Sequence, residues 1–367
     1  MGATKNFACQ TILDKIKQLE QEVRETPYHK GTEHHVGLLK AKIARLKREL
    51  EGREGKMAGG GGIGYAIKKH GDASCALVGP PSAGKSTLLN VLTGARSKTG
   101  HYDFTTLAVV PGIMEYRGAR IQIFDLPGLV EGASEGRGDG KRVISAIRGS
   151  DLVILMTDVD RLDWFEKIRY ELYRAGIRLN QRLPRVEIKK TNRGGIRIID
   201  PFNHFRRETV VGIAQEFGIK NAEVIFQEPV RSIDQLIDVF SGNRIYLPAI
   251  EVISQVDREP AFKDKNRILV SAKKKIGLKQ LKEAIWQALG LIRIYLKRSR
   301  SAEPDFIHPL ILRKGAVVVD AIKKISSELL NQVNEVLIWG PGAKFPAQPV
   351  PFSFPLRDET ILYFIKK

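Results

Sequence analysis

The sequence predicts an α/β fold with a mostly parallel sheet and helices on both faces, and three observations support this. An apolar run at residues 75–78 leads into a glycine-containing loop at residues 79–87, after which the chain can continue as a helix. A second apolar run, residues 119–124, ends in the tetrapeptide Asp-Leu-Pro-Gly. Buried strands then alternate with helices, a rhythm typical of parallel sheets whose ligands bind at the carboxyl ends of the strands.

The loop at residues 79–87 fits the phosphate-binding pattern G-x-x-x-x-G-K-[ST]. Glycines let backbone N–H groups close around phosphate oxygens, and the following helix N-terminus adds partial positive charge. We therefore expect Lys85 to reach the β- and γ-phosphates of a nucleotide and the Ser86 hydroxyl to hold Mg²⁺. The candidate nucleotide ligands in this loop are Gly79, Pro80, Pro81, Ser82, Ala83, Gly84, Lys85, Ser86 and Thr87.

The tetrapeptide Asp125, Leu126, Pro127 and Gly128 is a second group of candidate nucleotide ligands. The pattern D-x-x-G is common by itself, but its position after a phosphate loop makes it specific. We expect Asp125 to bind Mg²⁺ through a water molecule and the Gly128 amide to sense the γ-phosphate. The charged, glycine-rich residues 132–140 that follow are typical of a mobile switch loop.

Composition bounds the domain count and the class of protein. A length of 367 residues predicts two to four domains, and 43% hydrophobic residues can form real cores. Two cysteines form no disulfide framework, which predicts a cytoplasmic protein, and no apolar run is long enough for a membrane span. The net charge of +19 indicates a polyanionic partner, with RNA or the ribosome first, DNA second and an anionic membrane surface third. We expect a monomer.

The N-terminal residues 1–58 predict a helical hairpin. Pro27 to Gly31 breaks the pattern between two helices, and each helix carries an apolar stripe at helical spacing. The stripes consist of Ile12, Ile16, Leu19 and Val23 in the first helix and Leu39, Ile43, Leu46 and Leu50 in the second.

The nucleotide domain is predicted in two parts, residues 59–167 and 244–295, separated by an insertion. After a glycine-rich linker at 57–64, its first part contains a strand pair, 107–111 and 119–124, that turns near residues 117–118. A helix at 141–148, a strand at 152–156 and a helix at 163–176 follow. The second part contains strands at 247–253 and 267–270 and a helix at 277–290.

The insertion, residues 168–243, predicts a small α/β module with a helix near 207–217. It carries a basic patch around two adjacent glycines, made of Arg182, Arg185, Lys189, Lys190, Arg193 and Arg197. Residues 296–301 are basic and polar, as in a linker, and open the C-terminal unit, 296–367. Strand patterns at 336–339 and 361–364, with a helix carrying Ile322, Ile325 and Leu329, fit a small ubiquitin-like β-grasp module.

The order of these motifs resembles a known family. Residues 79–87, 104–107 and 125–133 are similar to Obg-type, translation-factor-related GTPases, and more closely to the archaeal and eukaryotic developmentally regulated GTP-binding proteins. Residues 176–180, 194–196 and 236–238 resemble the insertion of that subfamily, and residues 339–340, 343–344 and 348 resemble its C-terminal TGS domain. The resemblance implies a P-loop GTPase fold, hydrolysis of GTP to GDP with Mg²⁺, and association with ribosomes or translation.

Residue roles follow from the resemblance. Thr106 resembles the switch residue that closes on Mg²⁺ and the γ-phosphate, so the catalytic candidates are Lys85, Thr106 and Gly128 and the metal candidates are Ser86, Thr106 and Asp125. The segment Ser271, Ala272 and Lys273 resembles the loop whose backbone contacts guanine O6.

Departures from the family pattern leave alternatives open. The guanine-reading motif N-K-x-D is replaced by Ser254, Gln255, Val256 and Asp257, and Ser254 is shorter than the Asn that braces the loop. An ATPase, or an NTPase without purine selectivity, is therefore one alternative. A nucleotide-binding RNA or assembly protein with little hydrolysis is another. Leu129 follows D-x-x-G where Ras-like enzymes carry a water-positioning Gln, so we expect slow hydrolysis. Ser82 stands where some related enzymes have an Asn that helps to bind K⁺, so K⁺ dependence stays open, as does an activating protein partner.

Overall fold

The computed structural model describes residues 2–57, 71–94, 110–126 and 140–366. The chain divides into two compact units. One joins Met1–Gly64 to Gly176–Tyr246, and the other joins Tyr65–Ala175 to Leu247–Lys367.

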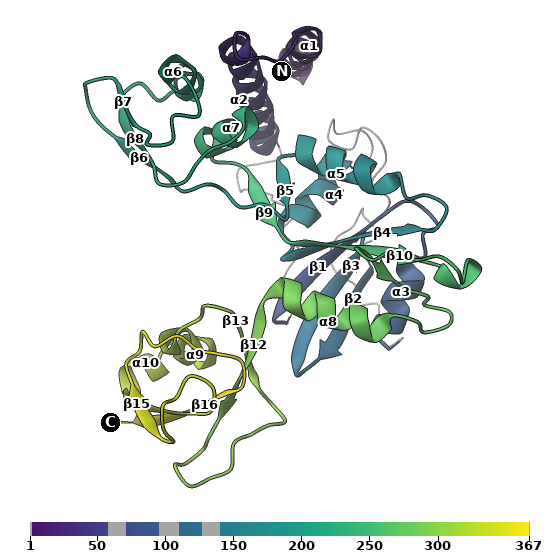
Figure 1. Cartoon of the computed structure of the whole chain (residues 1–367), viewed down its shortest axis with the longest axis vertical. Helices are drawn as coiled ribbons and strands as arrows, with labels where there is room; N and C mark the ends of the chain where they lie inside the picture. Colours follow the sequence, from purple (N-terminus) through teal and green to yellow (C-terminus); the bar gives the residue numbers. More distant parts are fainter. Residues whose placement is uncertain (1, 58–70, 95–109, 127–139, 367) are drawn as a thin grey trace. The chain divides into compact units, whose positions relative to one another are not determined.

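The nucleotide domain of the second unit is built on a six-stranded sheet with the strand order β11-β10-β4-β1-β3-β2 (Figure 1). Neighbouring strands run parallel except β2 and β3, which confirms the mostly parallel sheet. The strands are β1 (Ala73–Val78), β2 (Val110–Tyr116), β3 (Ala119–Asp125), β4 (Leu152–Asp158), β10 (Ala249–Ser254) and β11 (Ile268–Leu269).

Helices cover both faces of this sheet, as predicted. Helices α3 (Lys85–Leu92) and α8 (Leu278–Leu289) lie on one face, and α4 (Gly140–Arg148) and α5 (Trp164–Arg174) lie on the other (Figure 1). Every residue of β1 and β4 is buried, because central parallel strands are covered on both sides. Their carboxyl ends, and the loops that follow them, form one edge of the sheet.

Helix α5 corrects the predicted start of the insertion. Phe165, Ile168 and Leu172 are buried, and α5 belongs to the unit that contains the nucleotide domain. The predicted boundary at residue 168 therefore cuts through one helix, whereas the units divide at Gly176. Trp164, the first residue of α5, is only partly buried, and the Lys167 ammonium lies 5.3 Å from its ring centre.

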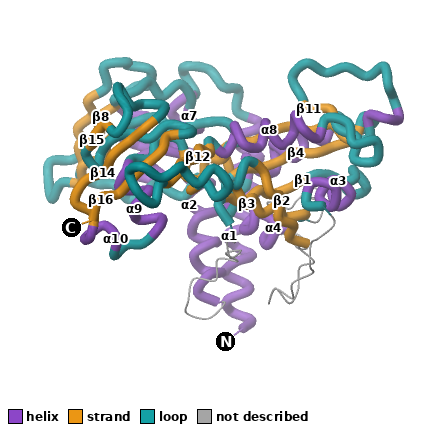
Figure 2. Tube along the Cα trace, turned by 90° about the horizontal axis from the view of Figure 1, so that it is seen from below, coloured by secondary structure: helices purple, strands orange, loops and turns teal. Residues whose placement is uncertain are grey.

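The N-terminal hairpin has the predicted form, with α1 (Gly2–Glu25) and α2 (Glu33–Met57) lying side by side (Figure 2). The two apolar stripes face each other in one cluster, because Ile12, Ile16 and Leu19 bury against the matching stripe of α2. Val23 and Leu50 complete the cluster as partly buried members.

The hairpin shares a core with the inserted module, which the sequence did not indicate. Ala41 and Ala44 of α2 lie in the same buried cluster as Val210 and Ile213 of α6. A Cβ atom on Gly37 would lie 3.3 Å from the side chains of Ile213 and Ile233, so glycine permits this close approach. The module's elements are β5 (Ile177–Leu179), β6 (Val186–Lys190), β7 (Ile196–Ile199), α6 (Arg207–Glu216), β8 (Ala222–Phe226), α7 (Ile233–Ser241) and β9 (Ile245–Leu247).

The C-terminal domain contains a five-stranded sheet with the order β13-β12-β16-β14-β15. Its first strand, β12 (Leu291–Leu296), lies ahead of the predicted boundary at residue 296, where a linker was expected. The predicted helix ends at Ile325, and Leu329 begins a separate short helix. The remaining elements are β13 (Leu310–Arg313), α9 (Val318–Ile325), α10 (Leu329–Gln332), β14 (Val333–Trp339), β15 (Gln348–Val350) and β16 (Thr360–Lys366).

Several predictions fall outside the described residues. These are most of the glycine-rich linker, the loop with Thr106, the residues Pro127 and Gly128, and nearly all of the expected switch loop. Within the described ranges, no helix is both long enough and apolar enough to cross a bilayer.

Candidate nucleotide site

The phosphate loop connects β1 to α3 at the carboxyl edge of the sheet. A Cβ atom on Gly79 would lie 2.0 Å from the carbonyl oxygen of Met156 on β4, so only glycine fits there. Ser82 and Gly84 both have left-handed backbone conformations, with φ of 61° and 84°. The loop therefore takes its shape from a close approach between strands and from two unusual backbone positions.

Lys85, the first residue of α3, closes the loop from inside. Its ammonium Nζ donates hydrogen bonds to the carbonyl oxygens of Gly79 at 3.0 Å and Pro80 at 2.9 Å. Burial lowers the pKa of the Lys85 ammonium, and the Asp125 carboxylate opposes this effect. An ammonium group has three N–H donors, and two of them are used by these carbonyls. The group is thereby fixed as a compact positive charge at the loop, where phosphate oxygens would bind.

Ser86 and Asp125 meet beside this lysine. The Ser86 hydroxyl donates a hydrogen bond to the Asp125 carboxylate, which stands at the end of β3. Hydroxyl and carboxylate oxygens are the hard ligands that Mg²⁺ binds together with water and phosphate. These residues therefore fit a magnesium ion. Leu126 contributes differently, because its side chain is fully buried and its N–H donates to Leu77 O at 3.2 Å.

A cavity of about 290 Å³ lies next to the phosphate loop. The structure brings many of the predicted ligands together around it: Gly84, Thr87, Ser254, Gln255, Asp257, Ser271, Ala272 and Lys273. They come from the phosphate loop and α3, from the end of β10 and the loop after it, and from the loop that follows β11. The cavity is thus continuous with the phosphate loop and lies at the edge where a purine base would be placed.

Asp257 is the acidic residue on the cavity wall, within the short 3₁₀ helix Val256–Arg258. A hydrogen bond from the Ser271 side chain holds the pKa of the Asp257 carboxyl below its usual value, and Lys273 and Lys274 lower it further. The Ser271 hydroxyl also accepts the Lys274 N–H at 3.0 Å. Asp257 therefore presents an ionised carboxylate, which only accepts hydrogen bonds.

Ser254 reaches further than the sequence suggested. Its buried hydroxyl Oγ lies 2.6 Å from Ala83 O in the phosphate loop and 3.0 Å from Thr157 O on β4. The side chain is shorter than the asparagine of the motif, but the pairing of β10 with β4 brings both carbonyls within its reach. The hydroxyl has one proton for two acceptors, so the brace is incomplete compared with an amide.

Comparison with known proteins agrees with this geometry. The family model described as 50S ribosome-binding GTPase matches residues 74–189. A model of the C-terminal region of that GTPase domain matches residues 193–291, and the TGS domain model matches residues 292–366. A GTP-binding protein of Methanocaldococcus jannaschii is 44% identical over 97% of this chain and 93% of its own length. Human developmentally-regulated GTP-binding protein 2 is 38% identical over 97% of this chain and all of its own. The chain belongs to the developmentally regulated GTP-binding proteins.

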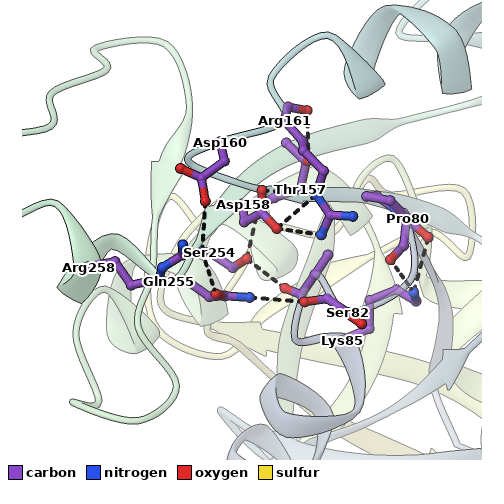
Figure 3. A network of polar contacts seen from close by, with 12 residues as sticks. Pro80, Ser82, Lys85, Thr157, Asp158, Asp160, Arg161, Ser254, Gln255 and Arg258 are labelled. Carbon is purple, nitrogen blue, oxygen red and sulfur yellow. Dashed lines mark hydrogen bonds and ion pairs between the residues drawn. The ribbon is translucent and has the colours of Figure 1, made fainter.

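The residues around the candidate nucleotide site include an ion pair that the sequence did not indicate. Arg161 donates from Nε to the Asp158 carboxylate at 3.0 Å, next to the phosphate loop (Figure 3). Although burial raises the pKa of the Asp158 carboxyl, hydrogen bonds from Arg161 bring it below its ordinary value. In the sequence, Asp158 and Arg161 are opposite charges at the end of a buried strand. The carboxyl ends of such strands form the edge of the sheet where ligands are expected.

Two further residues of the GTP-binding protein were missed because they matched no motif. Met156 supplies the carbonyl against which Gly79 packs, and it also lines the cavity. Arg258, one residue beyond the base-reading motif, lines the same cavity. Neither position could be recognised without knowing that β4 and β10 are neighbours.

Proposed function

We propose that this GTP-binding protein is a magnesium-dependent GTPase that works as a slow switch. The observation that carries the proposal is the meeting of the Ser86 hydroxyl with the Asp125 carboxylate beside the phosphate loop and Lys85. A site with these groups suits phosphoryl transfer, in which positioning and charge neutralisation provide nearly all of the catalysis.

The protein's own residues would act as follows. Lys85 and the backbone N–H groups of the loop would neutralise the β- and γ-phosphates, and Ser86 and Asp125 would hold Mg²⁺, which supplies further positive charge when bound. By family resemblance, Thr106 and Gly128 would close on the γ-phosphate and be released after hydrolysis. No described residue is placed as a general base, which fits a slow rate.

Guanine is the base that the cavity suits best. The ionised Asp257 carboxylate can accept hydrogen bonds from N1–H and the 2-amino group of guanine, and adenine has neither donor. The backbone of residues 271–273, on the same wall, would face guanine O6. The proposed substrate is therefore GTP.

Binding and single-turnover measurements test this function. Labelled GTP, ATP and XTP are compared for affinity, and hydrolysis of GTP is followed with Mg²⁺, in Na⁺ and in K⁺, with and without ribosomes. We expect a GTP preference and an unaided rate on the order of 10⁻⁴ s⁻¹, the intrinsic rate of a small GTPase. Fast hydrolysis by the protein alone in Na⁺ would contradict the slow switch, and equal affinity for ATP would contradict the guanine assignment.

We also propose that the protein associates with RNA or the ribosome. The net charge of +19 and the printed description of the matching family model support this. Within the predicted basic patch, Arg182, Arg185, Lys189 and Arg197 lie within 4 Å of glutamates, whereas Lys190 and Arg193 are exposed and have no ion-pair partner among the described residues. Within this patch, these two cations are therefore the ones we assign to contacts with phosphates.

Charge reversal tests this association. Lys190→Glu with Arg193→Glu should weaken binding to ribosomes or rRNA across sequences and flatten its salt dependence, because fewer counterions are released. Arg182→Glu with Arg185→Glu is the matched control, expected to have a smaller effect because Glu228 already lies near both arginines. Equal effects of the two pairs, or affinity independent of salt, would contradict the assignment.

A further inference from the structure

Gln255 stands where the family motif has lysine, and its amide is bonded on both sides. Its Nε2 donates to Ser82 O of the phosphate loop at 3.0 Å, and its Oε1 accepts from Arg258 Nη1 at 3.2 Å (Figure 3). A carbonyl only accepts and a guanidinium only donates, so the two partners determine the orientation of the amide.

Arg258 is held in turn from a third loop. Its Nη1 lies 2.8 Å from the carboxylate of Asp160, which follows β4 (Figure 3). The chain of contacts from Asp160 through Arg258 and Gln255 to Ser82 thus ties together the loops after β4, β10 and β1. We call these four residues the latch.

The backbone at both ends of the central hydrogen bond is unusual. Ser82 and Gln255 have φ of 61° and 57°, a region that residues other than glycine adopt at a cost. Such conformations persist where the surroundings hold them, and they concentrate at functional sites. The latch therefore connects two strained turns, one at the phosphate loop and one at the cavity wall.

The chemistry of the purines separates this role from base recognition. Guanine and adenine differ at position 6 and at N1 and the 2-amino group, whereas both present the N7 acceptor. The amide of Gln255 is already bonded to Ser82 and Arg258, and the hydroxyl of Ser254 to backbone carbonyls. Of the described cavity residues, Asp257 and the backbone of residues 271–273 are the groups that we assign to distinguishing guanine.

We propose that the latch replaces the motif lysine as a positioning device, which sets the affinity and dissociation rate of purine nucleotides without distinguishing guanine from adenine. This inference rests on the proposed GTP-binding function of the same site. It predicts that replacing the asparagine and lysine of the motif with Ser254 and Gln255 changes the affinity for purine nucleotides. The ratio of GTP to ATP affinity is expected to stay the same.

The test compares Gln255→Met, which keeps the length of the side chain and removes its donor and acceptor, with the wild type. We expect the affinities for GTP and for ATP to fall by the same factor, about 3- to 10-fold, and GDP to dissociate faster by a similar factor, as for one net hydrogen bond. Gln255→Lys, which restores a donor toward Ser82 O, should recover most of the loss. Gln280→Met on the exposed surface of α8 is the matched control and should change nothing.

The outcomes separate the latch from the site that it serves. A change in the GTP to ATP ratio of Gln255→Met beyond about threefold would make Gln255 a base-reading residue and overturn the inference. Unchanged affinities and dissociation rates in Gln255→Met would overturn the latch alone. Failure of the wild type to bind either nucleotide would overturn the proposed function together with the latch.

Discussion

The two ends of the nucleotide site lie on the same edge of one sheet but are built differently. Among the described residues, the phosphate end is nearly continuous chain, residues 79–87, to which β3 adds Asp125. The base end collects single residues from the loops after β4, β10 and β11, and side-chain hydrogen bonds connect them. The phosphate end follows its motif at each specified position, whereas the base end keeps only Asp257 of the three positions that N-K-x-D specifies.

The difference shows which kind of site tolerates substitution. At the phosphate end the proposed ligands combine backbone N–H groups with the side chains of Lys85, Ser86 and Asp125. The shape of the loop depends on contacts such as that between Gly79 and Met156 O, which a residue with a Cβ atom does not permit. At the base end, polar side chains other than the motif's asparagine and lysine contact carbonyl oxygens of the phosphate loop. Ser254 and Gln255 do so from the same positions. The residues that brace the loop can therefore differ, whereas Asp257, the residue proposed to contact the base, cannot.

The largest effect is expected at the phosphate end. Lys85→Ala should weaken GTP binding at least about 100-fold, because charge-assisted hydrogen bonds are worth roughly 1.5–3 kcal/mol each and the lysine would make more than one. The variant should stay folded, since the ammonium contacts only loop carbonyls. Calorimetric titration with GTP measures the affinity, and circular dichroism checks the fold. Binding within a few-fold of wild type would show that the loop is not the phosphate site.

Adding a methyl group at Gly79 should also weaken GTP binding strongly, in this case through a steric clash. Gly79→Ala places its Cβ about 2.0 Å from Met156 O, so the loop or β4 must shift. We expect GTP affinity to fall more than about 10-fold and thermal stability to decrease, as for other overpacked positions that cost roughly 1–3 kcal/mol. Gly149→Ala is the control, because its Cβ would meet its nearest neighbours at an ordinary 3.6 Å. Equal melting temperatures for the two variants would contradict this account.

At the base end, Asp257→Asn should change selectivity rather than overall binding. An amide donor would face the 2-amino group of guanine, so the preference for GTP over ATP should fall about 10- to 100-fold, the range for one hydrogen bond to a charged group. XTP, which has a carbonyl at that position, should bind better than to the wild type. Competition binding with the three nucleotides measures this, and an unchanged GTP preference would show that the carboxylate does not read the base.

The pH dependence of the wild type adds a second measurement on Asp257. The pKa of the Asp257 carboxyl in the folded protein is held below the usual 3.8. Recognition of guanine needs the ionised carboxylate, so the preference for GTP over ATP is complete above pH 3.8. It is lost as the pH falls through the lowered pKa. The GTP to ATP ratio should therefore be constant between about pH 5 and pH 8. A decline within that interval would mean that another group controls recognition.

The same contrast explains what the sequence could predict. The phosphate loop and the buried strands are local patterns, so the sheet, α3 and the nine loop residues were recognised directly. The latch was not recognised from the sequence, because Asp160 and Arg258 are far apart in the chain. Their contact can be expected only when β4 and β10 are known to be neighbours. The union of the hairpin with the inserted module was missed because α2 makes it with Ala41, Ala44 and Gly37, small residues that form no apolar stripe.

The smallest effect is expected from restoring the asparagine of the motif. The Ser254 hydroxyl has one proton for two acceptors, Ala83 O and Thr157 O. The side-chain NH₂ of Ser254→Asn has two protons, so it could donate a hydrogen bond to each carbonyl. The gain is at most one neutral hydrogen bond, about 0.5–1.5 kcal/mol, and the larger side chain must fit a buried position. We expect GTP and ATP to bind tighter by the same factor, no more than about 10-fold, with melting temperature reporting whether the side chain fits. Tighter binding of GTP alone would place the residue at position 254 in contact with the base, and the division between reading and bracing would then be wrong.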